Sequence, residues 1–275
     1  MEFKKRMYRK WNLDVPREEI RAMAERCAGD PSAYNKSTLS GPYIPADSAD
    51  WNGQTLVFRG EGRVFRFEIL SENELLFSEG DGEPVSCWCQ IKTMEGVFYF
   101  LNHLAPGGDC TRQISLIFDR ETGCATLCDA HIGTEFCSFD VEREFLFGRL
   151  DGDFAGGALH GFTNDLIGKA IAWDYGPQTR VTPKHMYTSN LYYSYSVSTA
   201  NGAWMASNPA NYVKLRDNYY LVSFLEERQT GIQALLLVNL DTLHDIGTFY
   251  GVSGDHIVSA FVAAIGTPGE PYTIF

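Results

Sequence analysis

The sequence predicts an all-β protein, with two antiparallel β-barrels that follow a short helical arm at the N-terminus. From residue 51 on, runs of alternating apolar and polar residues rich in Val, Phe, Tyr and Thr indicate strands that bury one face. Turn residues separate these runs roughly every ten residues, as in sandwiches and barrels. The order of the runs then recurs in the second half of the chain, which indicates two similar units.

The composition limits what the protein can bind. Its 275 residues are 44% hydrophobic and 13% aromatic, enough for one large or two ordinary domains with buried cores. The formal charge is −12, from 23 Lys and Arg against 35 Asp and Glu, so nucleic acid and anionic membranes are poor partners. There is no signal-peptide pattern and no apolar run of transmembrane length, so we expect a cytoplasmic protein.

Residues 1–50 differ from the rest and are expected to form the N-terminal helical arm. Pro16–Cys27 predicts one amphipathic helix, because Pro stands in its first turn and acidic residues follow at once. Gly29 is expected to end it. The stretch up to Asp50, rich in Ser, Pro and Asp, is expected to be a loop over the body, as a lid or strap or as a plain packing arm.

Seven runs predict the strands of a first barrel within residues 51–150. They are Gln54–Arg59, Val64–Leu70, Glu74–Ser78, Ser86–Ile91, Val97–Leu101, Gln113–Phe118 and Ala125–Leu127. An antiparallel meander of this length must close on itself to protect its edges. Within the second run, Arg66 and Glu68 alternate with Phe65 and Phe67, and we expect the charged pair to face solvent.

The second half, residues 151–275, repeats this order and predicts a second barrel. Matching segments lie 122 residues apart (219 minus 97, and 241 minus 119): Val97–Leu101 with Tyr219–Ser223, and Ser115–Asp119 with Leu237–Asp241. A short helix is expected at His160–Ile167, before the repeat begins.

The cysteines and the motifs absent from the chain indicate chemistry without metal or cofactor. The seven cysteines are Cys27, Cys87, Cys89, Cys110, Cys124, Cys128 and Cys137. They are expected to be reduced, buried thiols, because no second Cys-x-x-Cys pair or nearby His supplies zinc spacing. Nucleotide, nicotinamide, serine-hydrolase and zincin motifs are also missing. The functions that remain are cofactor-free chemistry by positioned acids and bases, or ligand binding alone.

The segment from Gly168 to Gly251 carries the densest set of polar and aromatic residues. Strand alternation puts these side chains on matching faces: Trp173, Tyr175, His185, Tyr187, Tyr193, Tyr195, Phe224 and Glu226. A packed core would favour aliphatic residues there, because a buried polar group without a partner costs a few kcal/mol. The pattern therefore predicts a cavity lining. In the first half, His103 is expected to be an exposed turn residue.

Three of these residues are predicted to be catalytic. His185 would act as general acid or base, and Tyr187, with its Cα about 7 Å away on the same strand face, would bind an oxyanion together with Tyr195. Glu226 would pair with His185. The substrate-binding wall would consist of Trp173, Tyr175, Tyr193, Tyr195 and Phe224. The alternative is an outward-facing His185 and a Glu226 solvated at the end of its strand.

Several segments resemble the molybdenum cofactor biosynthesis protein F (MoaF-like) family. They are Gly53–Ile69, Gly168–Tyr175, His185–Tyr187, Tyr220–Glu226 and Asp245–Gly251, and the resemblance covers about residues 50 to 265. It implies two lipocalin-like, or calycin, barrels, with a His-x-Tyr motif and an aromatic-x-Glu motif in the second. The chain has Phe224 where Trp is common in that family. A looser fold analogy links it to phenolic acid decarboxylases, calycin barrels that work without cofactor.

Three functions follow as hypotheses. The first is a cofactor-independent lyase or isomerase, such as a decarboxylase, dehydratase or aldol-type cleaving enzyme, acting on a small aromatic or unsaturated carbonyl compound bound in the second barrel. The alternative is a non-catalytic, lipocalin-like small-molecule binding protein. A third, a partner in a larger assembly, suits the acidic composition. A homo-oligomer is compatible with all three.

Overall fold

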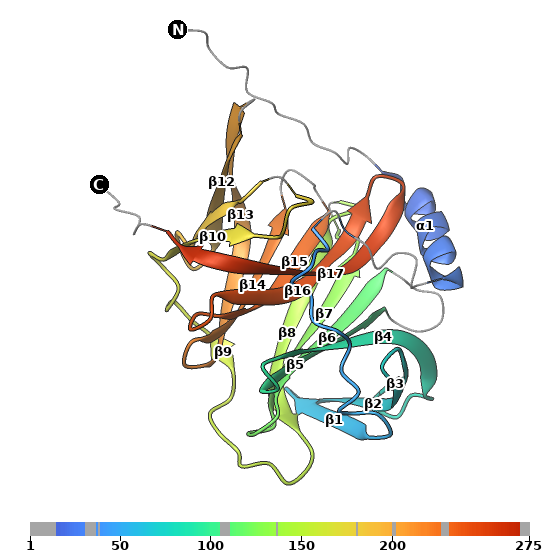
Figure 1. The fold of residues 1–275 in the computed structure, drawn as a ribbon. Coiled ribbons are helices and arrows are strands. Elements are labelled where there is room, and N and C mark those ends of the chain that lie inside the picture. The colour runs from blue at the N-terminus through green and yellow to red at the C-terminus, as the bar shows by residue number, and fades with distance from the viewer. Residues whose placement is uncertain are drawn as a thin grey trace, which may run out of the picture.

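The computed structural model contains, in its described part, two closed eight-stranded antiparallel barrels and one helix (Figure 1). It describes residues 15–30, 37, 39–104, 111–135, 137–179, 181–199, 202–226 and 231–269. The predicted fold class is confirmed. Cys110 lies outside the described residues, and so do residues 1–14, 31–36 and 38 of the expected N-terminal arm.

The first barrel is a meander of β1 to β8, closed by the pairing of β1 with β8. The strands are Thr55–Gly60 (β1), Arg63–Ser71 (β2), Glu74–Glu79 (β3), Val85–Met94 (β4), Phe98–Leu104 (β5), Arg112–Asp119 (β6), Cys124–Ile132 (β7) and Val141–Leu150 (β8). Phe65 and Phe67 fill its interior with other apolar side chains, whereas Arg66 and Glu68 are exposed, as predicted. The predicted domain boundary falls at the end of β8, and the division into domains stays a prediction.

The second barrel is a meander of β10 to β17. Its strands, with the short β9, are Gly161–Phe162 (β9), Ala170–Asp174 (β10), Lys184–Met186 (β11), Tyr192–Thr199 (β12), Gly202–Arg216 (β13), Tyr219–Glu226 (β14), Ile232–Asn239 (β15), His244–Ser253 (β16) and His256–Pro268 (β17). β10 pairs with both β11 and β17, and the pairing of β12 with β13 completes the ring.

The predicted helix at His160–Ile167 is wrong. Gly161 and Phe162 form β9, which pairs with Lys214 and Val213 on the edge of β13. A short apolar run fits a helix turn or a strand equally well, and the long neighbouring strand decides the outcome by offering backbone partners. The chain therefore enters the second barrel through an added strand.

The two barrels repeat the same strand order with a defined register. Tyr99 of β5 and Tyr220 of β14 both point into their barrel interiors, at an offset of 121 residues (220 minus 99). The predicted offset of 122 is therefore wrong here. An offset of 122 would align Tyr220 with Phe98, but the side chain of Phe98 points out of its barrel and packs in the interface between the two barrels. A shift of one residue moves every side chain of a strand to the opposite face.

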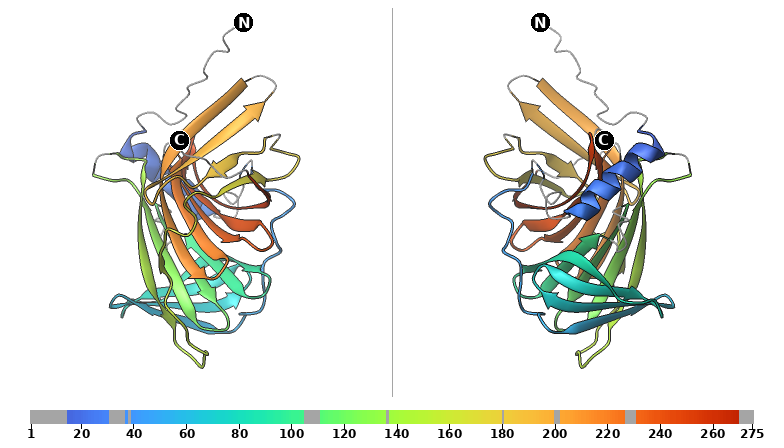
Figure 2. Two further views of the ribbon diagram at one scale, coloured as in Figure 1. Left: turned by 90° about the vertical axis from the view of Figure 1, so that its left-hand side faces the viewer. Right: turned by 90° about the vertical axis from the view of Figure 1, so that its right-hand side faces the viewer.

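The barrels pack against each other through the outer faces of β4 to β8 and β13 to β17 (Figure 2). Phe100 and Phe261 meet edge to face there, with ring centroids 5.3 Å apart. Polar side chains within this interface bind one another, as in the hydrogen bond from Ser259 Oγ to Gln113 Oε1 at 2.8 Å. An apolar interface with paired polar groups holds the barrels as one body.

Helix α1 (Arg17–Gly29) lies across both barrels (Figure 1). It buries Ile20, Met23 and Cys27 against β7 and β8 of the first barrel and β16 and β17 of the second. No helix in the described part of the chain is long and apolar enough to cross a membrane.

The segment from Leu39 to Asp50 runs over the barrels as a strap, which agrees with the expected loop over the body. The Ser40 hydroxyl donates to the carbonyl oxygen of Phe261 at 2.7 Å, and Asp47 pairs with Lys92 at 2.9 Å. Leu39 reaches the wall of the cavity in the second barrel. The strap therefore contributes to that cavity as well as to packing.

A candidate ligand site in the second barrel

The second barrel contains a cavity of about 510 Å³. This size suits a small molecule, since ligand pockets commonly occupy about 300–1,000 Å³. Its wall is made by Leu39, Tyr175, Thr179, Val181, Pro183, His185, Tyr193, Tyr195, Val197, Trp204, Phe224, Glu226 and Phe249. Six of the eight side chains singled out from the sequence belong to it: Tyr175, His185, Tyr193, Tyr195, Phe224 and Glu226.

Tyr187 and Trp173 are buried in the same barrel but are not part of the cavity wall. β11 has only three residues, so Tyr187 follows the strand and its ring packs edge to face on Tyr212 at 5.6 Å. Trp173 is enclosed on β10 next to Gly266, where a Cβ would collide with its indole. Tyr187 therefore shares a strand face with His185 but lies at a different depth of the barrel, away from the cavity wall.

His185 is 4% exposed and lies among aromatic rings. Its ring centroid is 5.1 Å from that of Tyr193 and 5.9 Å from that of Phe224. Burial lowers the pKa of His185 to about 3, so the imidazole is neutral at neutral pH. Its Nδ1 atom is buried and makes no hydrogen bond within the described part of the chain. A buried polar atom without a partner calls for an explanation, and a ligand in the adjoining cavity would supply one.

Glu226 binds Tyr195 instead of His185. The Tyr195 hydroxyl donates to Oε1 of Glu226 at 3.1 Å, and the half-buried carboxylate lies at the end of β14. The predicted His185–Glu226 pair is not formed among the described contacts. The cross-strand register explains this, because Tyr195 stands directly opposite His185 and its longer side chain reaches the carboxylate.

The remaining wall is aromatic. Tyr193 contacts Phe224 at 4.3 Å between ring centroids, and its hydroxyl accepts a hydrogen bond from Nδ2 of Asn208 at 3.3 Å. Burial raises the pKa of Tyr193 well above its usual value, so the phenol stays protonated. Flat rings with a few fixed polar groups are typical of a site that orients an aromatic ligand.

Asp245 is the residue that sequence reasoning missed. It is fully buried on the inner face of β16, opposite Val238 and Ala264, which belong to the barrel core. Burial raises the pKa of Asp245 well above its usual value, and Tyr175 is its neighbour. The available signal was its alternation with Gly247 and Phe249, which puts a carboxyl on an inward face.

The corresponding end of the first barrel is closed by ion pairs. Arg112 reaches Asp129 at 2.6 Å and Glu79 at 2.9 Å. Burial alone would raise the pKa of Asp129, but hydrogen bonds from Arg112 and His131 hold it well below its usual range. This network covers the end of an interior already filled by side chains such as Phe67.

His103 lies beneath this network, and its prediction as an exposed turn residue is wrong. It is 1% exposed and packs on Phe77 at 4.7 Å between ring centroids. β5 continues through Leu104, so His103 is an inward strand residue. At the offset of 121 it occupies the place of Phe224 (224 minus 103).

The described cysteines are free thiols, and all but Cys137 are buried. Burial raises the pKa of Cys87 and of Cys89 to about 12, which makes both poor nucleophiles. In the described part of the chain, no three His, Cys, Asp or Glu side chains gather so as to hold a metal ion.

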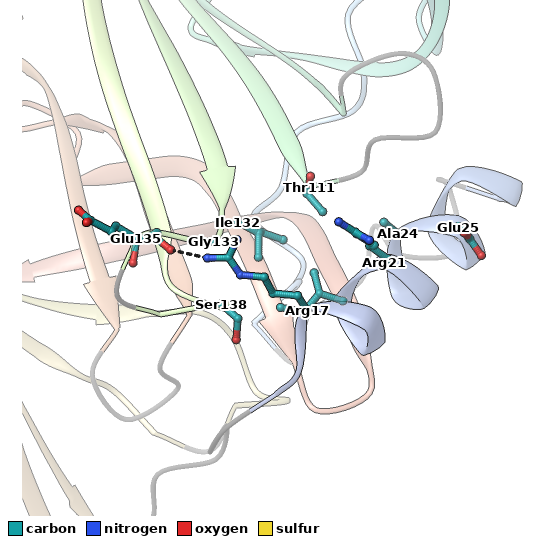
Figure 3. Close-up of a pocket in the computed structure, with 11 residues that line it drawn as sticks. Arg17, Arg21, Ala24, Glu25, Thr111, Ile132, Gly133, Glu135 and Ser138 are labelled. Atoms are coloured by element: carbon teal, nitrogen blue, oxygen red, sulfur yellow. Dashed lines mark hydrogen bonds between the residues drawn. The ribbon is translucent and has the colours of Figure 1, made fainter.

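A second hollow, of about 650 Å³, lies between α1 and the end of β7 (Figure 3). Arg17 extends from the helix toward Gly133 and Glu135, whereas Arg21 lies beside Thr111 and Glu25 lies farther along the helix. The Arg17 guanidinium donates to the backbone oxygen of Thr134 at 3.1 Å, which ties the helix to the loop. The charged groups here belong to exposed or half-buried residues, unlike the buried groups of the second barrel.

Fold and cavity together define the chain as a double β-barrel protein whose second barrel carries an aromatic cavity. Residues 160–268 match the family model described as the MoaF C-terminal domain. The second barrel is therefore similar to that family's C-terminal domain, as the sequence resemblance implied. The match includes the whole described wall except Leu39. No curated protein matches the chain.

Proposed function

We propose that the second barrel binds a small aromatic or unsaturated carbonyl compound. The observation that supports this most is His185, a neutral, buried imidazole in the cavity wall whose Nδ1 makes no hydrogen bond in the described structure. In one tautomer a ring nitrogen of His185 donates to a carbonyl oxygen. The rings of Tyr193, Phe224 and Phe249 offer faces and edges for the aromatic part of the ligand.

A second candidate function is turnover of this ligand by a cofactor-free lyase or isomerase. The contact between Tyr195 and Glu226 favours it, because the carboxylate is fixed at the cavity wall by a phenol. Glu226 would remove a proton from the carbon next to the carbonyl, and the electron pair would move to the carbonyl oxygen. Return of the proton to another carbon gives an isomer; loss of a leaving group gives a lyase product.

His185 has a different role in this proposal from the one expected from its sequence. With its pKa lowered to about 3 by burial, it is a weak base at neutral pH. It would serve as a neutral hydrogen-bond donor to the ligand oxygen, and Glu226 would be the base.

Benzylideneacetone, an aromatic unsaturated ketone, tests binding, with its allylic alcohol as the comparison ligand. We expect calorimetry to show that the ketone binds more tightly than the alcohol. His185→Gln should weaken ketone binding by about tenfold, the effect of one hydrogen bond of about 1.4 kcal/mol. His103→Gln is the matched control, because that residue is an equally buried neutral imidazole in the other barrel. Equal affinity in both variants would rule the proposed site out.

Proton exchange separates an enzyme from a carrier. An active base exchanges the methyl protons next to the carbonyl of bound benzylideneacetone with deuterium from solvent, which proton NMR follows. Glu226→Gln should abolish this exchange while the ketone still binds. A wild-type protein that binds the ketone without accelerating exchange is a binding protein for this ligand.

A further inference from the structure

We infer that Asp245 is a positioning residue that makes the hydroxyl of Tyr175 a hydrogen-bond donor for the ligand's carbonyl oxygen. The inference rests on the proposed function and deepens it, because it names a second donor for the ligand's carbonyl oxygen.

Asp245 lies inside the second barrel. Its cross-strand neighbours Val238 and Ala264 belong to the core of the second barrel, and opposite residues of an antiparallel pair share a face. Asp245 therefore points into the barrel, and none of its surface is exposed. It is not part of the cavity wall, but its neighbour Tyr175 is.

The surroundings of Asp245 disfavour a negative charge. No Lys or Arg of the described residues forms an ion pair with Asp245. The hydroxyl of Tyr175 and the backbone amide of Ala264 approach the carboxyl, yet among the described residues neither carboxyl oxygen of Asp245 has a partner in full hydrogen-bond geometry. The titratable neighbours are the phenols of Tyr175 and Tyr187, both neutral. An ionised carboxylate is very unfavourable in such surroundings, so Asp245 is a neutral acid.

The charge of Asp245 sets the direction of a hydrogen bond with Tyr175. A protonated carboxyl has one O–H donor, and a carboxylate has none. Neutral Asp245 can donate to the oxygen of Tyr175, which leaves the phenol hydrogen free to bind a ligand oxygen. An ionised Asp245 would take that hydrogen, and Tyr175 could then only accept from the ligand. The charge of a residue outside the wall thus decides whether Tyr175 donates to a ligand oxygen or can only accept from a ligand hydroxyl.

Infrared difference spectroscopy of the ligand-free protein tests the charge. The spectrum of wild type minus Asp245→Asn should contain the band of a protonated carboxylic acid at neutral pH. A carboxylate band there would overturn the inference, whatever ligand the cavity binds.

The carbonyl stretch of bound benzylideneacetone tests the role of Tyr175. In wild type this band should lie at lower frequency than in an apolar solvent, and Tyr175→Phe should move it back. Asp245→Asn keeps an N–H donor for Tyr175 and should retain most of the shift, whereas Asp245→Ala should lose it. Thermal unfolding of each variant verifies that it folds.

The outcomes separate this inference from the proposed function. Binding that depends on His185, with the same stretch in wild type and Tyr175→Phe, would overturn the role of Asp245 alone. Absence of ketone binding in wild type would overturn the proposed function and this role with it.

Discussion

The hydroxyl of Tyr195 donates to Oε1 of Glu226 at 3.1 Å, although the two residues belong to strands that do not pair. β13 lies between β12 and β14 and pairs with both. The contact bridges one wall of the cavity across that strand. It fixes the half-buried carboxylate of the site.

Removal of this donor should have a measurable structural effect. Tyr195→Phe is expected to lower the free energy of unfolding by about 0.5–1.5 kcal/mol, the net value of one hydrogen bond. Urea titration followed by circular dichroism measures it. Tyr192→Phe is the matched control, since Tyr192 lies on the same strand with its side chain about half exposed. Equal midpoints for the two variants would contradict the importance of the contact.

The buried histidines should destabilise the protein in acid. Burial lowers the pKa of His103 and of His160 to about 4 and that of His185 to about 3, against 6.5 for an ordinary histidine. At a pH between the folded and unfolded pKa values, the unfolded chain binds more protons than the folded protein. The stabilisation from the neutral histidines is therefore fully present above pH 6.5, and the free energy of unfolding falls as the pH drops toward 4. Each residue contributes a slope of at most about 1.4 kcal/mol per pH unit.

The measurement is urea unfolding at several pH values between neutrality and the acid limit of folding. His185→Gln should give a shallower pH dependence than wild type, because one of the three histidines no longer takes up a proton on unfolding. Curves that stay parallel over this range would show that His185 is protonated in the folded protein.

Asp245 should change the pH dependence of stability in the direction opposite to that of the buried histidines. Burial raises its pKa above the ordinary 3.8, so the folded protein binds the extra proton. Wild type then loses stability from this residue as the pH rises above 3.8 and up to the raised pKa. Asp245→Asn removes this loss, so its stability relative to wild type should increase with pH. Asp255→Asn, at a fully exposed side chain, should show no such rise. A constant difference between Asp245→Asn and wild type would refute the neutral acid.

The interface between the barrels should be important for global stability. Phe261 is buried there against Phe100, and Phe261→Ala is expected to cost about 3–5 kcal/mol from lost burial and the remaining cavity. Phe162→Ala, at a mostly exposed ring on β9, should cost much less. Urea unfolding compares them. A small effect of Phe261→Ala would mean that the barrels are stable without this contact.

Strand faces were predictable because they depend on local alternation. Phe65 and Phe67 point inward as expected, and Tyr175, Tyr193 and Phe224 gather at one cavity. His103 was assigned wrongly, because a turn signal from Pro and Gly does not show where the strand ends. The His160–Ile167 segment failed as a helix because its partner strand lies about 50 residues away in sequence.

By itself, the sequence determined the all-β class, the repeated strand order and the inward faces, since a strand's period of two is a local property. Only the tertiary structure decided that Glu226 meets Tyr195, that Tyr187 lies away from the cavity and that ion pairs cover the first barrel instead of the second. Closing a barrel brings together residues from distant strands, and the charge of a group such as Asp245 follows from how completely those residues exclude water.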